Sequence, residues 1–183
     1  FEKELNELGS LRAKADAIRT RLAKSINTKY QENPAYYENF SKRIKEALEL
    51  YKARTITEAE YLAKMRDILE DYRTGKSAIA YPNRIRANVH AQAFYGVLTA
   101  IFSNEKLSVE PDFAAEMALD ITTIIEKHSQ VDWTHNLTIH DRISQDIDDL
   151  FYRYQKEMGL VLSFDVIDMI IENVKTVALR RFA

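Results

Sequence analysis

Residues 33–73 read NPAYYENFSKRIKEALELYKARTITEAEYLAKMRDILEDYR, and this stretch predicts two consecutive helices. Asn33-Pro34 is typical of a helix start, because proline suits the first helical position. Thr57 and Glu60 have the spacing of a capping box that begins the second helix, and Gly75 suits its C-terminal end. Apolar side chains recur at three- and four-residue steps, as on one helix face: Tyr37, Phe40, Ile44, Leu48 and Tyr51, then Tyr61, Met65, Ile68 and Tyr72.

The helical period continues on both sides of this stretch. Residues 1–31 are polar with weak apolar spacing, and Gly9-Ser10 either breaks this helix or restarts it. A helix is expected after Pro82, and Phe94 and Leu98 widen its apolar stripe, which indicates a central place in the core. Its stripe has a strict four-residue step: Ile85, Val89, Ala93, Val97 and Ile101. Three more helices are expected, with starts or ends at Pro111, Gly159 and Ser163 and with inward residues that include Met117, Ile121, Ile143, Ile147, Phe164, Ile167 and Ile171.

Composition agrees with this pattern and predicts an all-α fold, an irregular bundle of about six to eight helices. The 183 residues are 46% hydrophobic and 30% charged, as in a globular domain. Four glycines and three prolines are too few for the turns of a β-sandwich. Because a helical pattern already runs at Phe1, we expect residues 1–32 to form an N-terminal helix that continues from a preceding helical domain of a larger parent. Residues 33–183 are expected to form a helical C-terminal domain.

The search for chemistry returns incomplete motifs. Gly75-Lys76-Ser77 resembles the end of a phosphate-binding loop, but Glu70 stands where that loop needs its first glycine, so a helix end and basic turn are predicted. No acid lies two residues before a lysine, as metal-dependent nucleases require, and His135 and His140 lack the spacing of a helical zinc pair. Cysteine is absent, and no apolar run reaches the length of about 18 residues that a membrane span needs. We therefore predict no catalytic residue, metal or cofactor in this chain, and no membrane contact.

The uneven charge distribution is more informative. Residues 11–30 carry six basic side chains against one acid, and residues 72–104 carry four basic side chains and no acid. Two interpretations remain open: ordinary solvated helix faces, or a groove that follows the phosphates of a nucleic acid without reading its bases. The candidate phosphate contacts are Lys76, Arg84 and Arg86, then Arg19, Arg21 and Lys24. Similarly, Asp146, Asp148 and Asp149 form either a solvated helix face or an acidic patch that docks a basic partner.

Several elements together resemble the C-terminal region of the motor and restriction (R) subunit of type I restriction enzymes. That family combines a D/N-P-x-F/Y-Y pattern, a long charged helix, a short link and an E-E/A-E-Y-L helix. Later it has an A-F-Y element and a D-W element followed by a helix. The resemblance covers roughly residues 30–155; Asn33 and the final helix from Ser163 depart from the commoner pattern. The matching residues include Pro34, Tyr37, Tyr61, Phe94, Tyr95, Asp132, Trp133 and Arg142.

The resemblance implies a function through the parent protein. It implies a bacterial cytoplasmic enzyme that cleaves DNA and translocates on it with ATP and Mg²⁺, with both activities in other domains. This region is then a non-catalytic module that docks the R subunit on the methyltransferase and specificity subunits and contacts the backbone of duplex DNA. The matching residues serve either in docking or in the core. The alternative is a purely structural cap on the motor, without DNA or partner contacts.

Overall fold

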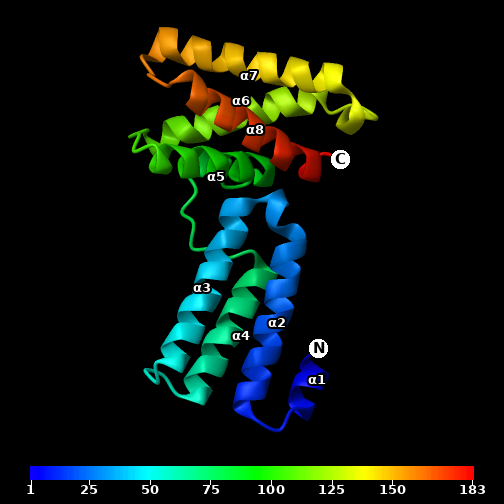
Figure 1. Ribbon diagram of the computed structural model, residues 1–183, viewed down its shortest axis with the longest axis vertical. Coiled ribbons are helices and arrows are strands. Elements are labelled where there is room, and N and C mark those ends of the chain that lie inside the picture. Colours follow the sequence, from blue (N-terminus) through cyan, green and yellow to red (C-terminus); the bar gives the residue numbers. More distant parts are fainter. The chain divides into compact units, whose positions relative to one another are not determined.

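The computed structural model describes residues 1–183 and contains eight α-helices, three short 3-10 helices and no strand (Figure 1). The predicted all-α class is therefore confirmed. The chain forms two compact units: unit 1 comprises residues 1–30 and 36–79, and unit 2 comprises residues 31–35 and 80–183. None of the helices combines the length and apolar character that crossing a bilayer requires.

Unit 1 is built from three long helices and a short one. These are α1 (Glu2–Glu7), α2 (Leu11–Lys29), α3 (Pro34–Lys52), whose first residues belong to unit 2, and α4 (Glu58–Thr74). Gly9-Ser10 separates α1 from α2, and the Ser10 hydroxyl caps α2 by accepting from the Ala13 N–H at 3.0 Å. The predicted boundary after residue 32 stays a prediction about the parent protein.

Local capping signals determine the ends of α3 and α4. The helix α3 begins at Pro34, as predicted, and both hydrogen bonds of the Thr57–Glu60 capping box are present at the start of α4. Gly75 ends α4 in the left-handed conformation with φ 74°, which glycine adopts without a Cβ penalty. Apolar side chains from α1, α2, α3 and α4 then meet in one core, which includes Ile18, Leu22, Ile26, Phe40, Ile44, Tyr61, Met65 and Ile68.

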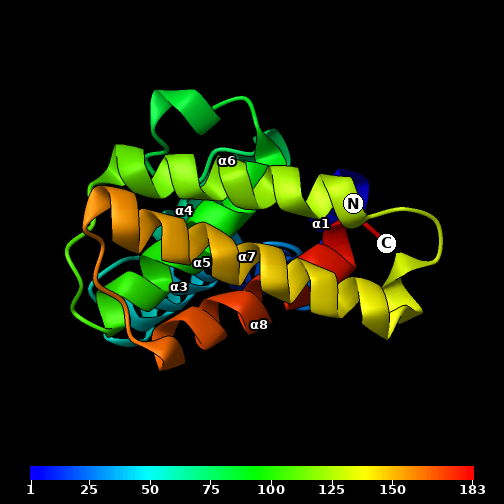
Figure 2. The same ribbon diagram turned by 90° about the horizontal axis from the view of Figure 1, so that it is seen from above.

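Unit 2 contains four long antiparallel helices. They are α5 (Val89–Asn104), α6 (Pro111–His128), α7 (Leu137–Met158) and α8 (Phe164–Arg181). The helices α6 and α8 each pack against both α5 and α7, so that α7 and α5 lie on opposite sides of them (Figure 1). Seen from above, α7 lies between α6 and α8 (Figure 2). The predicted central position of the helix that contains Phe94 and Leu98 is confirmed, because both side chains are fully buried.

Two predictions about unit 2 are wrong. The helix expected after Pro82 begins at Val89, because a 3-10 helix, η2 (Asn83–Ile85), comes first and the Asn88 side chain caps α5. Val89 is accordingly exposed in the first turn and does not face the core. Phe164 is also exposed, at 85%, because Ser163 begins α8 with Phe164 on its outer side. At both helix starts, the apolar period assigned one exposed residue to the core: Val89 in α5 and Phe164 in α8.

The end of α8 holds the segment of residues 31–35 within unit 2. Arg181 donates from Nε to Nδ1 of His90 at 3.1 Å and from Nη1 to the carbonyl oxygen of Glu32 at 2.9 Å. The Phe182 ring lies 4.3 Å from the His90 ring, centroid to centroid. Because its Nδ1 accepts this bond, His90 is neutral here; burial first, and then the Arg181 charge, lower its pKa from 6.5.

This arrangement predicts a pH dependence of stability. Since the folded-state pKa of His90 is depressed, the unfolded chain binds the proton first as the pH falls below 6.5. The native protein should therefore lose stability relative to His90→Gln between about pH 8 and about pH 5.5, with acidic groups contributing equally to both. Urea unfolding of both proteins at the two pH values measures the difference. Identical pH dependence in the two proteins would contradict this role of His90.

Candidate nucleic-acid interface

The candidate phosphate contacts are divided between the two units. Arg19, Arg21 and Lys24 lie on α2, and Lys76 follows α4, all in unit 1. Arg84 and Arg86 belong to unit 2. None of the ion pairs in the structure involves Arg21, Lys24, Lys76, Arg84 or Arg86. Their charges are therefore not matched by a carboxylate within 4.0 Å.

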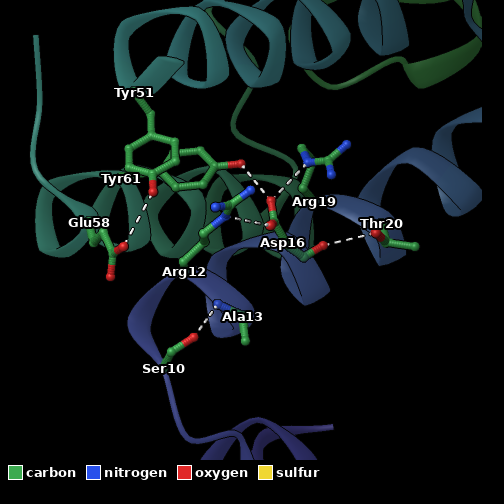
Figure 3. Close-up of polar contacts among 9 residues, drawn as sticks. All are labelled: Ser10, Arg12, Ala13, Asp16, Arg19, Thr20, Tyr51, Glu58 and Tyr61. Carbon is green, nitrogen blue, oxygen red and sulfur yellow. Dashed lines mark hydrogen bonds and ion pairs between the residues drawn. The ribbon is translucent and has the colours of Figure 1, made fainter. Parts of the chain in front are cut away.

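Arg19 differs from the other candidates because it belongs to a polar network on the α4 side of α2 (Figure 3). Its Nε donates to Oδ1 of Asp16 at 3.4 Å, and Arg12 approaches the other oxygen of the same carboxylate at 3.7 Å. The Tyr61 hydroxyl also donates to Asp16 at 3.3 Å. Burial first, and then the Asp16 charge, raise the pKa of Tyr61, so this hydroxyl stays a donor. The network satisfies Arg19 within unit 1.

Arg21 and Arg73 line one cavity of about 450 Å³ beside α1, α2 and α4. The Arg21 guanidinium lies 4.3 Å from the centroid of the Phe1 ring, a cation–π contact. Arg73 approaches Glu70 at 3.6 Å, and both side chains are largely exposed, so this pair is weak. Ser25 and Tyr72 also line this cavity, and their hydroxyl groups share a hydrogen bond of 2.7 Å. The lining thus combines the basic and polar groups with the acid Glu2 and with the apolar side chains of Phe1, Leu22 and Leu69.

Helical spacing explains why Arg19 lies on a different side of α2 from Arg21 and Lys24. At 100° per residue, Arg21 and Lys24 are about 60° apart around α2, whereas Arg19 is about 160° from Arg21. Lys14, seven residues before Arg21, shares the side of Arg21. The sequence contained this signal, since Asp16 lies three residues before Arg19 and four after Arg12, the spacings of helical ion pairs. The total charge of residues 11–30 does not show which basic side chains pair with Asp16.

Arg84 and Arg86 lie on a backbone segment that is fixed in place. Ile85 between them is fully buried, while both arginines are exposed. The Gln92 side-chain amide donates to the carbonyl oxygens of Ile85 at 3.1 Å and Arg86 at 2.8 Å. The Asn88 N–H donates to the Ile85 carbonyl oxygen at 3.0 Å. Two cationic side chains are therefore presented from a rigid turn. The role of Gln92 was not predicted, because no capping or turn motif specifies a side-chain bond back to carbonyl groups six and seven residues earlier.

The α6–α7 face of unit 2 carries paired charges instead. His128 Nε2 lies 2.7 Å from Asp146 Oδ2, and Lys127 donates to the same oxygen at 3.1 Å. The hydrogen bond from His128, with smaller contributions from Lys127, holds the pKa of Asp146 below its ordinary value. Nearby, the Tyr154 hydroxyl donates to Asp120, and burial, followed by Asp120, raises the pKa of Tyr154. A hollow of about 490 Å³ is lined by Asp120, Thr123, Ile124, Lys127, Asp146, Asp149, Leu150 and Arg153.

Several residues of the family elements are buried. Phe94 and Trp133 belong to the unit 2 core, where the Trp133 Nε1–H donates to the carbonyl oxygen of Phe182 at 2.9 Å. Tyr95 lies edge-on to Tyr81 with ring centroids 6.0 Å apart. Asp132 is exposed with φ 60°, a left-handed conformation that Asp tolerates better than most residues.

The remaining family-element residues are placed as follows. Pro34 is the first residue of α3. In unit 1, Tyr37 lies near Tyr72 with ring centroids 6.2 Å apart, and Tyr61 is fully buried and stacked on Tyr51 at 4.7 Å. Arg142 is exposed on α7. These residues thus range from core positions to the open surface.

Fold and site together define a class: an all-helical module with exposed arginines on fixed backbone. In this structure, no group of three His, Cys, Asp or Glu side chains is arranged so that it could hold a metal ion. A family model described as "Type I restriction enzyme HindI endonuclease subunit-like, C-terminal" matches residues 1–178. The chain belongs to this family, which confirms the resemblance to the C-terminal region of the R subunit.

A curated relative agrees with the family. The type I restriction enzyme HindI endonuclease subunit of Haemophilus influenzae is 25% identical over 127 residues, which cover 69% of this chain. The chain spans only 12% of that relative's length. No solved structure matches the chain.

Proposed function

We propose that this chain is the non-catalytic assembly and DNA-binding module of a type I restriction endonuclease R subunit. It docks the ATP-dependent translocase and endonuclease subunit on the methyltransferase core and contacts the backbone of duplex DNA. ATP, Mg²⁺ and the nuclease chemistry belong to other domains of the parent, which works in the bacterial cytoplasm. Family membership supports the assembly role, since the relative is named as one subunit of a restriction enzyme.

The pair Arg84 and Arg86 carries the DNA part of the proposal. Both side chains are exposed and without ion pairs, and the buried Ile85 and the Gln92 bonds fix the backbone between them. A rigid turn loses little conformational freedom when its arginines bind phosphates. Guanidinium groups also suit phosphate oxygens, because they donate two parallel hydrogen bonds.

Unit 1 supplies the second set of proposed phosphate contacts. Arg21 and Lys24 share one side of α2, and Lys76 is exposed beyond the end of α4. Arg19 is the weakest of the original candidates, since binding DNA would draw it from Asp16. No base-reading motif occurs, so the proposed contact is independent of sequence.

The double charge reversal Arg84→Glu with Arg86→Glu tests the DNA part. We expect the affinity of the 183-residue chain for non-specific duplex to fall about tenfold or more at low salt. The slope of log affinity against log salt should decrease by about 2, because two phosphate contacts are lost. Fluorescence anisotropy over a salt series measures both quantities.

A matched control is Lys45→Glu with Lys64→Glu. These lysines are exposed, and acids lie near them: Lys45 approaches Glu49 at 3.9 Å, and Lys64 shares a hollow with Glu46 and Asp67. The control changes the net charge equally but should leave the salt slope unchanged. If the two double variants bind DNA equally, Arg84 and Arg86 are not a DNA contact.

Removal of residues 30–183 from the full-length R subunit tests the docking part. The truncated protein should no longer assemble with the methyltransferase complex in analytical size-exclusion chromatography. Normal assembly would eliminate the docking role. Unchanged DNA binding together with normal assembly would instead favour the alternative, a structural cap on the motor.

A further inference from the structure

The turn between α7 and α8 exposes three large apolar side chains within seven residues. Met158 is 58% exposed, Val161 is 84% exposed and Phe164 is 85% exposed. We call these three residues the apolar turn. A single exposed apolar side chain is ordinary on a protein surface, but a group of them rimmed by polar residues is typical of an interaction site.

The backbone of the apolar turn is held in place from both sides. Gly159 ends α7 in the left-handed conformation with φ 66°. The Gln155 side-chain amide donates to the carbonyl oxygen of Leu162 at 2.9 Å, and the Leu162 side chain is buried. Ser163 caps α8 by accepting from the Val166 N–H at 3.2 Å. Val161 and Phe164 are therefore presented outward from a fixed backbone, which lowers the entropy cost of binding.

Acidic residues flank the apolar turn. Glu157 and Asp165 adjoin it in sequence, and Asp168 lies four residues after Phe164, on the same side of α8. All three are exposed, and Lys156 is the one basic residue between 156 and 172. This surface repels phosphates and favours a positively charged partner.

We propose that the apolar turn binds a protein segment that carries apolar side chains flanked by lysine or arginine. The proposal rests on the docking role proposed above and locates it: the segment belongs to the methyltransferase complex. Apolar anchors at the centre with charges at the rim are the usual anatomy of such an interface. DNA contacts and partner contacts then occupy surfaces of opposite charge on this chain.

The double variant Val161→Ser with Phe164→Ser in the full-length R subunit is the main test. Its affinity for the methyltransferase complex, measured by isothermal titration calorimetry, should fall about tenfold or more. Because both side chains are already exposed, the thermal unfolding midpoint should stay unchanged. Binding to non-specific duplex should also be unaffected.

A matched control replaces two exposed apolar residues by serine near the opposite end of α7. Val131 is 90% exposed and Leu137 is 75% exposed, so Val131→Ser with Leu137→Ser also replaces two largely exposed apolar side chains by serine. The control should assemble normally. A second arm, Glu157→Lys with Asp168→Lys, should slow association and reduce its salt dependence, because the electrostatic attraction is lost.

The outcomes separate this proposal from the docking role itself. If the truncated protein fails to assemble while Val161→Ser with Phe164→Ser assembles normally, docking stands and the apolar turn is not its site. If both assemble normally, both proposals fail. Self-association that the double variant abolishes, with unchanged methyltransferase binding, would assign the turn to a second copy and overturn the proposal.

Discussion

Replacing Trp133 by alanine is expected to lower the free energy of unfolding of unit 2 by about 3–5 kcal/mol. The side chain is 3% exposed, so the substitution leaves a cavity in the core that the neighbours fill only partly. It also removes the Nε1–H donor of the 2.9 Å bond to the Phe182 carbonyl oxygen. The His140 ring, edge-on at 5.7 Å, loses its packing partner. Urea unfolding followed by far-ultraviolet circular dichroism measures the loss.

Trp133→Phe separates the two contributions. Phenylalanine keeps an aromatic ring in the site but cannot donate to the Phe182 carbonyl oxygen, so the expected loss is smaller, about 1–2 kcal/mol. Asp132→Asn is the matched neighbour control, because asparagine tolerates the left-handed backbone at that position and should leave stability within about 0.5 kcal/mol. Equal losses for Trp133→Ala and Trp133→Phe would refute the assignment of Trp133 as a packing residue.

Gly96→Val is expected to destabilise unit 2 by about 3 kcal/mol, the upper end of the usual range for overpacking. A Cβ at Gly96 would lie 2.7 Å from the Cβ of Ala35, an atom whose position the backbone sets. The close approach of the chain at Ala35 to α5 therefore depends on the missing side chain. The single tryptophan of the chain, Trp133, lies in unit 2, so its fluorescence during unfolding reports the effect.

Two further variants make this prediction specific. Gly9 has no atom within 4 Å of its position for a Cβ, so Gly9→Val should change stability by less than about 0.5 kcal/mol. Ala35→Gly removes the opposing Cβ, so combining it with Gly96→Val should recover part of the loss, a non-additivity that a double-mutant cycle detects. Strict additivity of the two substitutions would rule out the close contact as the cause.

Much of the fold was predictable from sequence because helix ends are local. The Thr57–Glu60 capping box, Gly75, Pro111, Gly159 and Ser163 each marked a boundary that the structure shares. The start of α5 was misplaced although Asn88 was a usable capping signal, because the four-residue step from Ile85 to Val89 was interpreted as helical. In the candidate site, the basic side chains and the local pair of Arg19 with Asp16 were predictable from spacing, whereas the exposure of Arg84 and Arg86 around the buried Ile85 depends on the fold.

The sequence by itself determined that this chain is helical, where most helices end and which family it resembles. The helices and their ends depend on hydrogen bonds and side-chain periods within a few residues, and the resemblance depends on short motifs along the chain. Only the tertiary structure decided that residues 31–35 pack with unit 2, that Gly96 must lack a side chain, and that the Tyr61 hydroxyl donates to Asp16. Such contacts join residues far apart in the chain, and no local period or cap encodes which surfaces meet.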